Sequence, residues 1–216
     1  MGSTNDHGNK GSIVPLWVKI AYCLFVAVLI PVYWVHYGPG NFLWFSDIAL
    51  FGGAIALWRE RPFLPSLLAV AVLIPELAWN AGFFFRLFTG IDVFALTDYM
   101  FDEERPLYLR GLSLFHVIIP PLLIWFLYKL GYDRRGFWAA TIMAWIVFPL
   151  TYLLTDPSDN INWVYGFGDK QEWIHPDLFV GLLMILFPIV LYLPTHLVLK
   201  KIFRPPHEKG FNKQRS

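Results

Sequence analysis

Long apolar stretches dominate this chain, and each is about as long as a helix that crosses a membrane. A spanning helix needs about 20 mainly apolar residues. The composition agrees, because 56% of the 216 residues are hydrophobic and 15% are charged, against about 25% charged in a soluble domain. We therefore expect an all-α, polytopic membrane helix bundle. The six stretches predicted to form its transmembrane helices are 13–35, 42–58, 63–86, 109–130, 136–155 and 178–200.

The distribution of basic residues predicts the orientation of the chain. Lysines and arginines are concentrated near both ends and in the turns at 59–62 and 131–135. Cytoplasmic loops of membrane proteins carry an excess of these residues, so we expect both termini on the cytoplasmic side of a cell inner membrane. The predicted parts are a disordered tail (1–11), a transmembrane domain (12–203) with outer loops at 36–41, 87–108 and 156–177, and a disordered basic tail (204–216).

Two further features argue against other classes of protein. The net charge of +1 gives no basic surface suited to nucleic acid. Cys23 is the only cysteine, so the chain has no intramolecular disulfide and no paired-cysteine metal site. Membrane lipid is therefore the expected partner, and the sequence leaves a protein partner or a second copy of the chain open.

Two acidic residues interrupt the apolar stretches, Asp47 in the second and Glu76 in the third. A charged side chain in the middle of a membrane costs roughly 2.5–3.5 kcal/mol on insertion scales. Residues of this kind generally face a protein interior or a wet cavity and serve a function. The alternative, that both are protonated or hydrogen-bonded structural groups, stays open from the sequence alone.

The predicted orientation brings these acids to the same depth as an amide and an imidazole. Asn80 lies one helical turn after Glu76, so both share a face of the third helix. His116 lies in the outer half of the fourth helix. We therefore expect Asp47, Glu76, Asn80 and His116 to form an outward-facing pocket within the membrane. Ser46 is less suited to catalysis, because it belongs to a stripe of small residues typical of helix packing.

Two outer loops carry further polar residues to the mouth of this pocket. The turn HYGPGN contributes His36 and Asn41, and the segment TDPSDNINW contributes Asp156 and Asn160. Closely spaced oxygen ligands suit a divalent cation such as Ca²⁺, but a turn built on Asn and Asp side chains is the simpler explanation. The segment 97–110 predicts an amphipathic helix on the outer interface that serves as a lid.

These residue types suit catalysis on a lipid. A carboxylate beside a histidine orients the imidazole and raises its basicity, as general-base catalysis requires. His116 would be the general base or a metal ligand. Asp47 and Glu76 would orient it or help to coordinate Zn²⁺ or Fe²⁺, and Asn80 would position the substrate. The predicted function is a lipid-active hydrolase or acyltransferase, and the alternative is a non-catalytic ligand-binding, transport or accessory membrane subunit.

The motifs HYGPGNFLWFSD, PELAWN, SLFH and TDPSDNINW, found between His36 and Trp163, carry a resemblance to known proteins. The chain resembles an uncharacterised bacterial family of six-helix integral membrane proteins that share the patterns HYGPxNFLWFSD, PELxWN, SLFH and TDPxxNxNW. The helix with Ser46 and Asp47, followed by the helix with His116, is more distantly similar to YwaF-like membrane proteins. Some of those are implicated in acyl transfer on lipids through a Cys and a His, and the Cys position falls here on or near Ser46.

Overall fold

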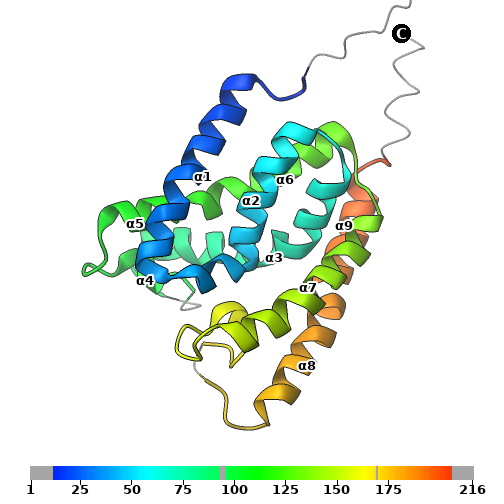
Figure 1. The fold of residues 1–216 in the computed structure, drawn as a ribbon. Helices are drawn as coiled ribbons and strands as arrows, with labels where there is room; N and C mark the ends of the chain where they lie inside the picture. Colours follow the sequence, from blue (N-terminus) through cyan, green and yellow to red (C-terminus); the bar gives the residue numbers. More distant parts are fainter. Residues whose placement is uncertain (1–11, 93–95, 169, 206–216) are drawn as a thin grey trace, which may run out of the picture.

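Helices make up all of the regular structure in the computed structural model, which describes residues 12–92, 96–168 and 170–205. The all-α prediction is therefore confirmed for these residues. The predicted tails lie outside the described residues, apart from positions 204 and 205. The elements in Figure 1 are α1 (Leu16–Tyr37), η1 (Pro39–Leu43), α2 (Phe45–Arg59), α3 (Phe63–Thr89), α4 (Asp98–Phe101), α5 (Leu107–Leu112), α6 (Phe115–Leu130), α7 (Arg135–Leu154), η2 (Ile161–Trp163), α8 (Pro176–Leu186), the π-helical η3 (Phe187–Tyr192) and α9 (Leu193–Ile202).

Five helical segments of the described chain are long and apolar enough to span a membrane. They are α1, α3, α7, the α5–α6 segment Leu107–Leu130 and the α8–α9 segment Pro176–Ile202. α2 occupies the remaining predicted span, but its 15 residues reach about 22 Å, less than a hydrocarbon core of about 30 Å. It starts late because η1 and the non-helical Trp44 precede it. The five long apolar helices are compatible with the predicted membrane bundle.

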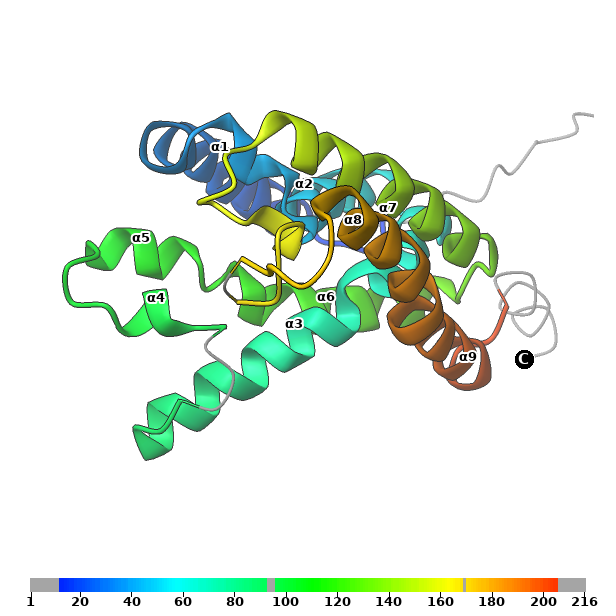
Figure 2. The ribbon, with the colours of Figure 1, turned by 90° about the horizontal axis from the view of Figure 1, so that it is seen from below.

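α3 lies at the centre of the bundle, packed against α2, α6 and α7 (Figures 1 and 2). In its most apolar stretch 50% of the residues are buried, against 17% in α1. Residues 68–73 are buried at every position, as expected for a helix surrounded by others. The outer helices instead expose large apolar side chains, with Trp17 at 72% and Leu153 at 73%. An exterior of this kind suits contact with acyl chains.

The long C-terminal helix continues through a proline because a neighbouring helix supplies the missing hydrogen bond. Pro188 has no N–H for the carbonyl of Met184, and the chain passes this point as the π-helical segment η3. The indole Nε1 of Trp145 in α7 donates to that carbonyl at 2.8 Å. The backbone group freed by the proline is therefore satisfied within the protein, as an apolar environment demands.

Glu60, at the end of α2, anchors the start of the chain. Its carboxylate accepts hydrogen bonds from the backbone N–H groups of Ile13 (2.8 Å) and Val14 (3.1 Å) and from the hydroxyl of Ser12. Lys19, buried in α1, pairs with the same carboxylate at 2.8 Å. Burial on its own would raise the pKa of Glu60, but the hydrogen bonds from Lys19, Ser12, Ile13 and Val14 outweigh it and lower the pKa to about 2.

Other contacts gather the remaining basic turns at the same end of the bundle. The N–H of Asp133, in the turn between α6 and α7, donates to Ser66 Oγ near the start of α3 at 2.9 Å. The N–H of Tyr132 donates to the carbonyl of Arg204, just after α9, at 3.1 Å. The start of α1, the α2–α3 turn, the α6–α7 turn and the end of α9 therefore share one end of the molecule.

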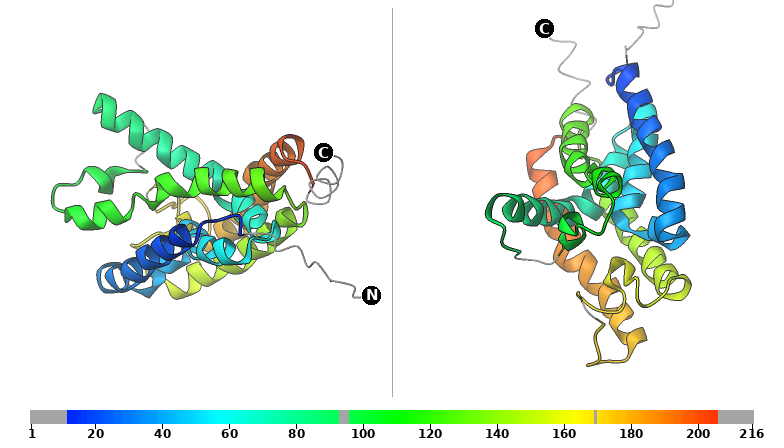
Figure 3. Two further views of the ribbon diagram at one scale, coloured as in Figure 1. Left: turned by 90° about the horizontal axis from the view of Figure 1, so that it is seen from above. Right: turned by 90° about the vertical axis from the view of Figure 1, so that its left-hand side faces the viewer.

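At the opposite end the segment 97–110 differs from its predicted form. It is not one amphipathic helix but two short helices, α4 and α5, joined by a turn. Pro106 explains the break, because it lacks an N–H and disfavours helical backbone at the residue before it. Tyr99 in α4 lines a cavity. The last turns of α3 diverge from the other helices beside this segment (Figures 2 and 3).

A close approach of α7 to the start of α3 at Gly136 predicts a stability change. A Cβ atom at Gly136 would lie 2.8 Å from the backbone carbon of Ser66 and 2.9 Å from the backbone nitrogen of Leu67. Because backbone cannot move aside cheaply, we expect Gly136→Ala to destabilise the protein by about 1–3 kcal/mol. Gly181→Ala is the control, since a Cβ there meets nothing within 4 Å. The free energy of unfolding in mixed micelles tests this, and equal values for the two variants would contradict it.

The lowered pKa of Glu60 predicts that the attachment of the N-terminal segment is sensitive to acid. A group whose pKa is lower in the folded state stabilises above its ordinary pKa of 4.5, and that stability is lost as the pH falls through about 2. We expect hydrogen exchange of residues 12–19, corrected for its intrinsic pH dependence, to speed up over this window. Glu60→Gln should expose the same residues at pH 7, whereas the exposed Glu103→Gln should not.

Candidate functional site

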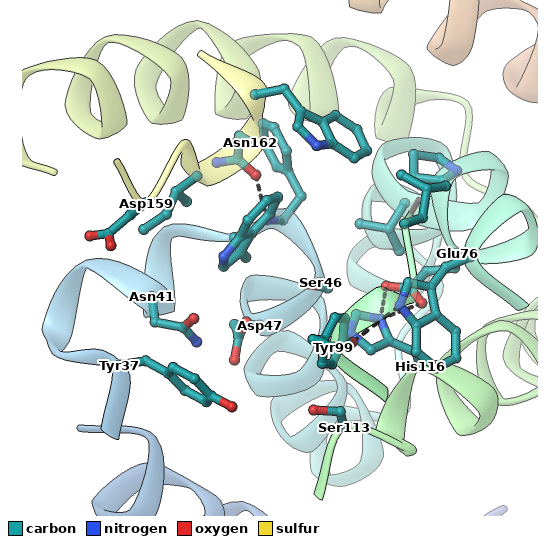
Figure 4. Close-up of a pocket in the computed structure, with 18 of the residues that line it drawn as sticks. Tyr37, Asn41, Ser46, Asp47, Glu76, Tyr99, Ser113, His116, Asp159 and Asn162 are labelled. Carbon is teal, nitrogen blue, oxygen red and sulfur yellow. Dashed lines mark hydrogen bonds and ion pairs between the residues drawn. The ribbon is translucent and has the colours of Figure 1, made fainter. Parts of the chain in front are cut away.

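An open cavity of about 880 Å³ lies at the end of the bundle opposite Glu60 (Figure 4). Its walls come from the end of α1, η1, the start of α2, the middle of α3, α4, the start of α6 and the loop after α7. The predicted site residues that line it are His36, Asn41, Asp47, Glu76 and His116, together with Ser46. Three predicted residues lie outside its lining, namely Asn80, Asp156 and Asn160.

Glu76 and His116 form a hydrogen-bonded pair in the cavity wall. The Nδ1 atom of His116 lies 2.9 Å from Oε2 and 3.1 Å from Oε1 of Glu76, so both carboxylate oxygens are within hydrogen-bonding distance. Glu76 is 3% exposed, whereas His116 is partly open to the cavity. A carboxylate that accepts from Nδ1–H fixes the tautomer and leaves Nε2 as the basic nitrogen. The pair therefore has the arrangement of an oriented general base.

Aromatic rings hold the imidazole of His116 in place. The ring stacks on Trp79 with a centroid distance of 4.6 Å and an interplanar angle of 21°. It also stacks on its neighbour Phe115 at 4.2 Å and 26°. The indole Nε1 of Trp79 donates to the hydroxyl of Tyr99 at 3.2 Å, which fixes Trp79 in turn. Nε2 of His116 has no hydrogen-bond partner in the described chain and stays available to a ligand.

Asp47 lies in the first turn of α2 and is 2% exposed. Its Oδ1 atom has no hydrogen-bond partner in the described residues. In Figure 4 its carboxyl points into the cavity near Tyr37 and Ser113, apart from the pair formed by Glu76 and His116. Buried polar atoms are nearly always satisfied, so an unpaired carboxylate oxygen facing a cavity is a feature that needs a chemical explanation.

Asn80 connects two helices instead of lining the cavity. Its Nδ2 donates to the carbonyl of Glu76 and to the carbonyl of His116, both at 2.8 Å. The carbonyl of His116 needs this donor because Pro120, four residues later in α6, has no N–H to offer it. Asn80 therefore holds α3 and α6 at the level of the Glu76–His116 pair. Asn80 was predicted to position the substrate, and in the structure it lies outside the cavity lining.

Several polar residues in the cavity wall were not predicted as site residues. Tyr33 binds Ser113 through their hydroxyls at 2.8 Å, and Nη1 of Arg105 donates to the hydroxyl of Tyr37 at 3.3 Å. Tyr33 and Tyr37 are one turn apart and pack edge to face at 5.1 Å, which places both on one face of α1. This spacing was the available sequence signal, but tyrosines near the end of a predicted span read equally well as interface anchors.

Asn162 caps α2 from a distant loop. Its Oδ1 accepts the N–H of Phe45 at 3.1 Å, and its Nδ2 donates to the carbonyl of Leu43 at 2.8 Å. The residue has a φ of 53°, a left-handed conformation that Asn tolerates better than most residues. Because Trp44, the N-cap residue, has no side-chain acceptor, this loop contact completes the start of α2 and sets the position of Asp47.

Three of the polar residues predicted at the mouth form hydrogen bonds within the protein. Asp156 accepts from the N–H (2.8 Å) and hydroxyl of Ser158, and those hydrogen bonds lower its pKa. Asn160 donates to the carbonyls of Gly166 and Gly168, both at 2.9 Å. His36 lies between the carbonyl of Val32 and the hydroxyl of Tyr108, each at 2.8 Å. The segment around Asp156 and Asn160 is thus a turn built on Asn and Asp side chains.

The predicted metal site at His116, Asp47 and Glu76 has no support from the geometry. No group of three or more His, Cys, Asp or Glu side chains in residues 12–92, 96–168 and 170–205 is arranged to hold a metal ion. The carboxylate of Glu76 is engaged by His116, and Asp47 points into another part of the cavity.

The bridging role of Asn80 predicts that substitutions of Asn80 and Pro120 have non-additive effects on the free energy of unfolding. We expect Asn80→Leu to cost about 1–3 kcal/mol, because it leaves the buried carbonyl of His116 unpaired. Pro120→Ala restores an N–H that can bond this carbonyl within α6, so the same Asn80→Leu change should cost less than half as much in that background. A double-mutant cycle on the free energy of unfolding measures the difference, and strict additivity would contradict the bridging role.

Comparisons of the chain with protein-family models, with curated proteins and with solved structures found no match. The functional argument therefore depends on the geometry of the cavity itself. The feature of that geometry with the most specific chemical meaning is the pair formed by Glu76 and His116 beside an open chamber lined in part by aromatic rings.

Proposed function

We propose that this chain is an integral enzyme of a bacterial inner membrane that hydrolyses or transfers an acyl group of a membrane lipid. In this proposal α2 is a sixth, partly sheltered crossing, and both termini lie in the cytoplasm. The cavity then opens toward the outer side. The single observation that carries the proposal is the hydrogen-bonded pair of Glu76 and His116 in the wall of a cavity of about 880 Å³.

The surroundings of the cavity favour a lipid as the substrate. Ligand sites are generally concave and apolar with a few convergent polar groups, and this one combines aromatic rings with the Glu76–His116 pair. The helices around it expose apolar side chains outward, including Val35 at 78% near the end of α1. A substrate that already resides among acyl chains can reach such a site from the membrane side.

The proposed reaction is general-base catalysis. Nε2 of His116 takes a proton from water as the water oxygen bonds to the ester carbonyl carbon. The bond from that carbon to the leaving alcohol then breaks, and the alcohol oxygen takes the proton back from His116. Glu76 stabilises the imidazolium that forms between the two steps. When the hydroxyl of a second lipid replaces water, the same proton movements give acyl transfer.

Ser113 is not the nucleophile in this proposal. Its hydroxyl is engaged with Tyr33 at 2.8 Å and with the carbonyl of Leu109 at 3.2 Å. No hydrogen bond joins it to His116, whose Nδ1 faces Glu76. A water molecule or a lipid hydroxyl entering the open cavity can reach the free edge of the imidazole more directly.

The proposal predicts loss of lipid turnover on removal of His116. Full-length protein in vesicles of mixed phospholipids should release fatty acid and lysophospholipid, detected by mass spectrometry. His116→Ala should lower the rate about 10²- to 10⁴-fold, the usual contribution of a general base. Glu76→Gln should lower it less, because the amide still orients the ring but cannot stabilise the imidazolium.

His175→Ala is the matched control, since His175 is an exposed histidine outside the cavity lining. It should turn over lipid at the rate of the unmodified protein. Turnover that survives His116→Ala would refute the general-base role. Vesicles in which the unmodified chain forms no product would refute lipid catalysis and favour a non-catalytic ligand-binding, transport or accessory role.

A further inference from the structure

We propose that Asp47 is the binding site for the ammonium headgroup of a membrane amphiphile. This inference rests on the proposed lipid function and names the class of lipid that the cavity accepts. Glu76 and His116 would act on the ester, whereas Asp47 would select the headgroup. The assignment follows from the unsatisfied Oδ1 atom of Asp47, the position of this residue at a helix start and the aromatic rings that line the same cavity.

The unsatisfied carboxylate needs a partner that the protein does not supply. Asp47 is 2% exposed, and its Oδ1 atom has no hydrogen-bond partner in the part of the chain that the structure describes. A buried carboxylate is strongly unfavourable unless it is paired and hydrogen-bonded. A ligand that brings a positive charge with N–H or N–CH₃ groups removes this penalty when it binds. The buried carboxylate is therefore lower in free energy with such a ligand bound than without it.

The start of α2 offsets part of the cost of a negative charge at Asp47. The residue lies in the first turn of a 15-residue helix, where the helix dipole stabilises an anion. Asn162, from the loop after α7, satisfies the first N–H of that helix without touching the carboxylate. The carboxylate is therefore kept free of local capping contacts and directed into the cavity.

Arg105, an arginine of the cavity wall, is engaged by other residues. Arg105 donates to the hydroxyl of Tyr37 at 3.3 Å, and its Nε pairs with Asp102 at 3.4 Å. His116 pairs with Glu76. No ion pair is formed by Asp47 in the described residues, so the compensating cation must come from the ligand.

The rings in the wall suit a cation as well. Tyr33, Tyr37, Trp44 and Tyr99 line the same cavity as Asp47. Aromatic faces attract ammonium groups, and a carboxylate beside several such rings is a common way to recognise alkylammonium ligands. A neutral sugar or glycerol headgroup would instead leave the carboxylate without a charge partner. A headgroup that ends in a phosphate, with no ammonium group beyond it, would be repelled by the carboxylate.

The full chain in neutral detergent tests this by native mass spectrometry, titrated with phosphatidylethanolamine or with phosphatidylglycerol of the same acyl chains. We expect the unmodified protein to bind the ethanolamine lipid about 10- to 100-fold more tightly, the range of a charge-assisted hydrogen bond. Asp47→Asn, of the same shape, should abolish the preference. Glu103→Gln, which removes the same charge from an exposed turn, should retain it.

The outcomes separate this inference from the proposed reaction. Equal binding of the two lipids by the unmodified protein would overturn the headgroup assignment even if Asp47→Asn failed to fold. A preference that survives in folded Asp47→Asn would overturn it too. Complete displacement of the lipid by free ethanolamine would identify a soluble amine as the ligand and overturn the amphiphile. None of these results depends on turnover, which His116→Ala tests on its own.

Discussion

The requirement that polar groups find partners inside the protein governs this structure. In a hydrocarbon environment no water replaces a missing hydrogen bond, so each group released from a helix must be paired by a neighbour. The indole of Trp145 pairs the carbonyl released by Pro188, and the amide of Asn80 pairs the one released by Pro120. Both contacts also fix one helix against another, so they satisfy backbone groups and set the packing of the bundle together.

Asp47 stands out against this background. The backbone carbonyls that the prolines of α6 and η3 leave free accept hydrogen bonds from neighbouring helices. The Oδ1 atom of this buried carboxylate, in contrast, has no hydrogen-bond partner in the described chain. Asp47 lines the cavity. The Glu76–His116 pair on another wall is fully formed. The cavity thus combines one site that is complete and one that lacks a partner, which suits a ligand with a reactive group and a charged group at separate positions.

The helices could be predicted from the sequence because apolar stretches and helical rise follow simple rules. Those rules also placed Asp47, Glu76 and His116 at similar depth, and the structure brings all three to one cavity. The role of Asn80 could not be predicted, because it depends on a carbonyl that Pro120 leaves free in another helix. A residue's depth follows from its position in the sequence, whereas its hydrogen-bond partner depends on how each helix is rotated.

The other residues of the cavity wall could not be predicted from the sequence for similar reasons. Tyr33 and Tyr99 have the composition of membrane-interface residues, and only the tertiary fold turns them inward. Asn162 reaches α2 from a loop more than a hundred residues later, and its cap cannot be predicted from local sequence. Pro106 was the available sign that the segment 97–110 would divide, because a proline in the middle of a helix removes a donor and blocks the preceding turn.

The length of α3 ties the shape of the cavity to the thickness of the surrounding bilayer. Its 27 residues extend about 40 Å, more than a hydrocarbon core of about 30 Å, so the helix must tilt or carry its last turns beyond the acyl chains. Trp79 and Glu76 lie on this helix, whereas Tyr33 and Asp47 lie on α1 and α2. A thicker membrane would reduce the tilt of α3 and change the distance between these two walls of the cavity. The lipid composition around the protein would therefore alter the shape of the cavity and the ligands that fit it.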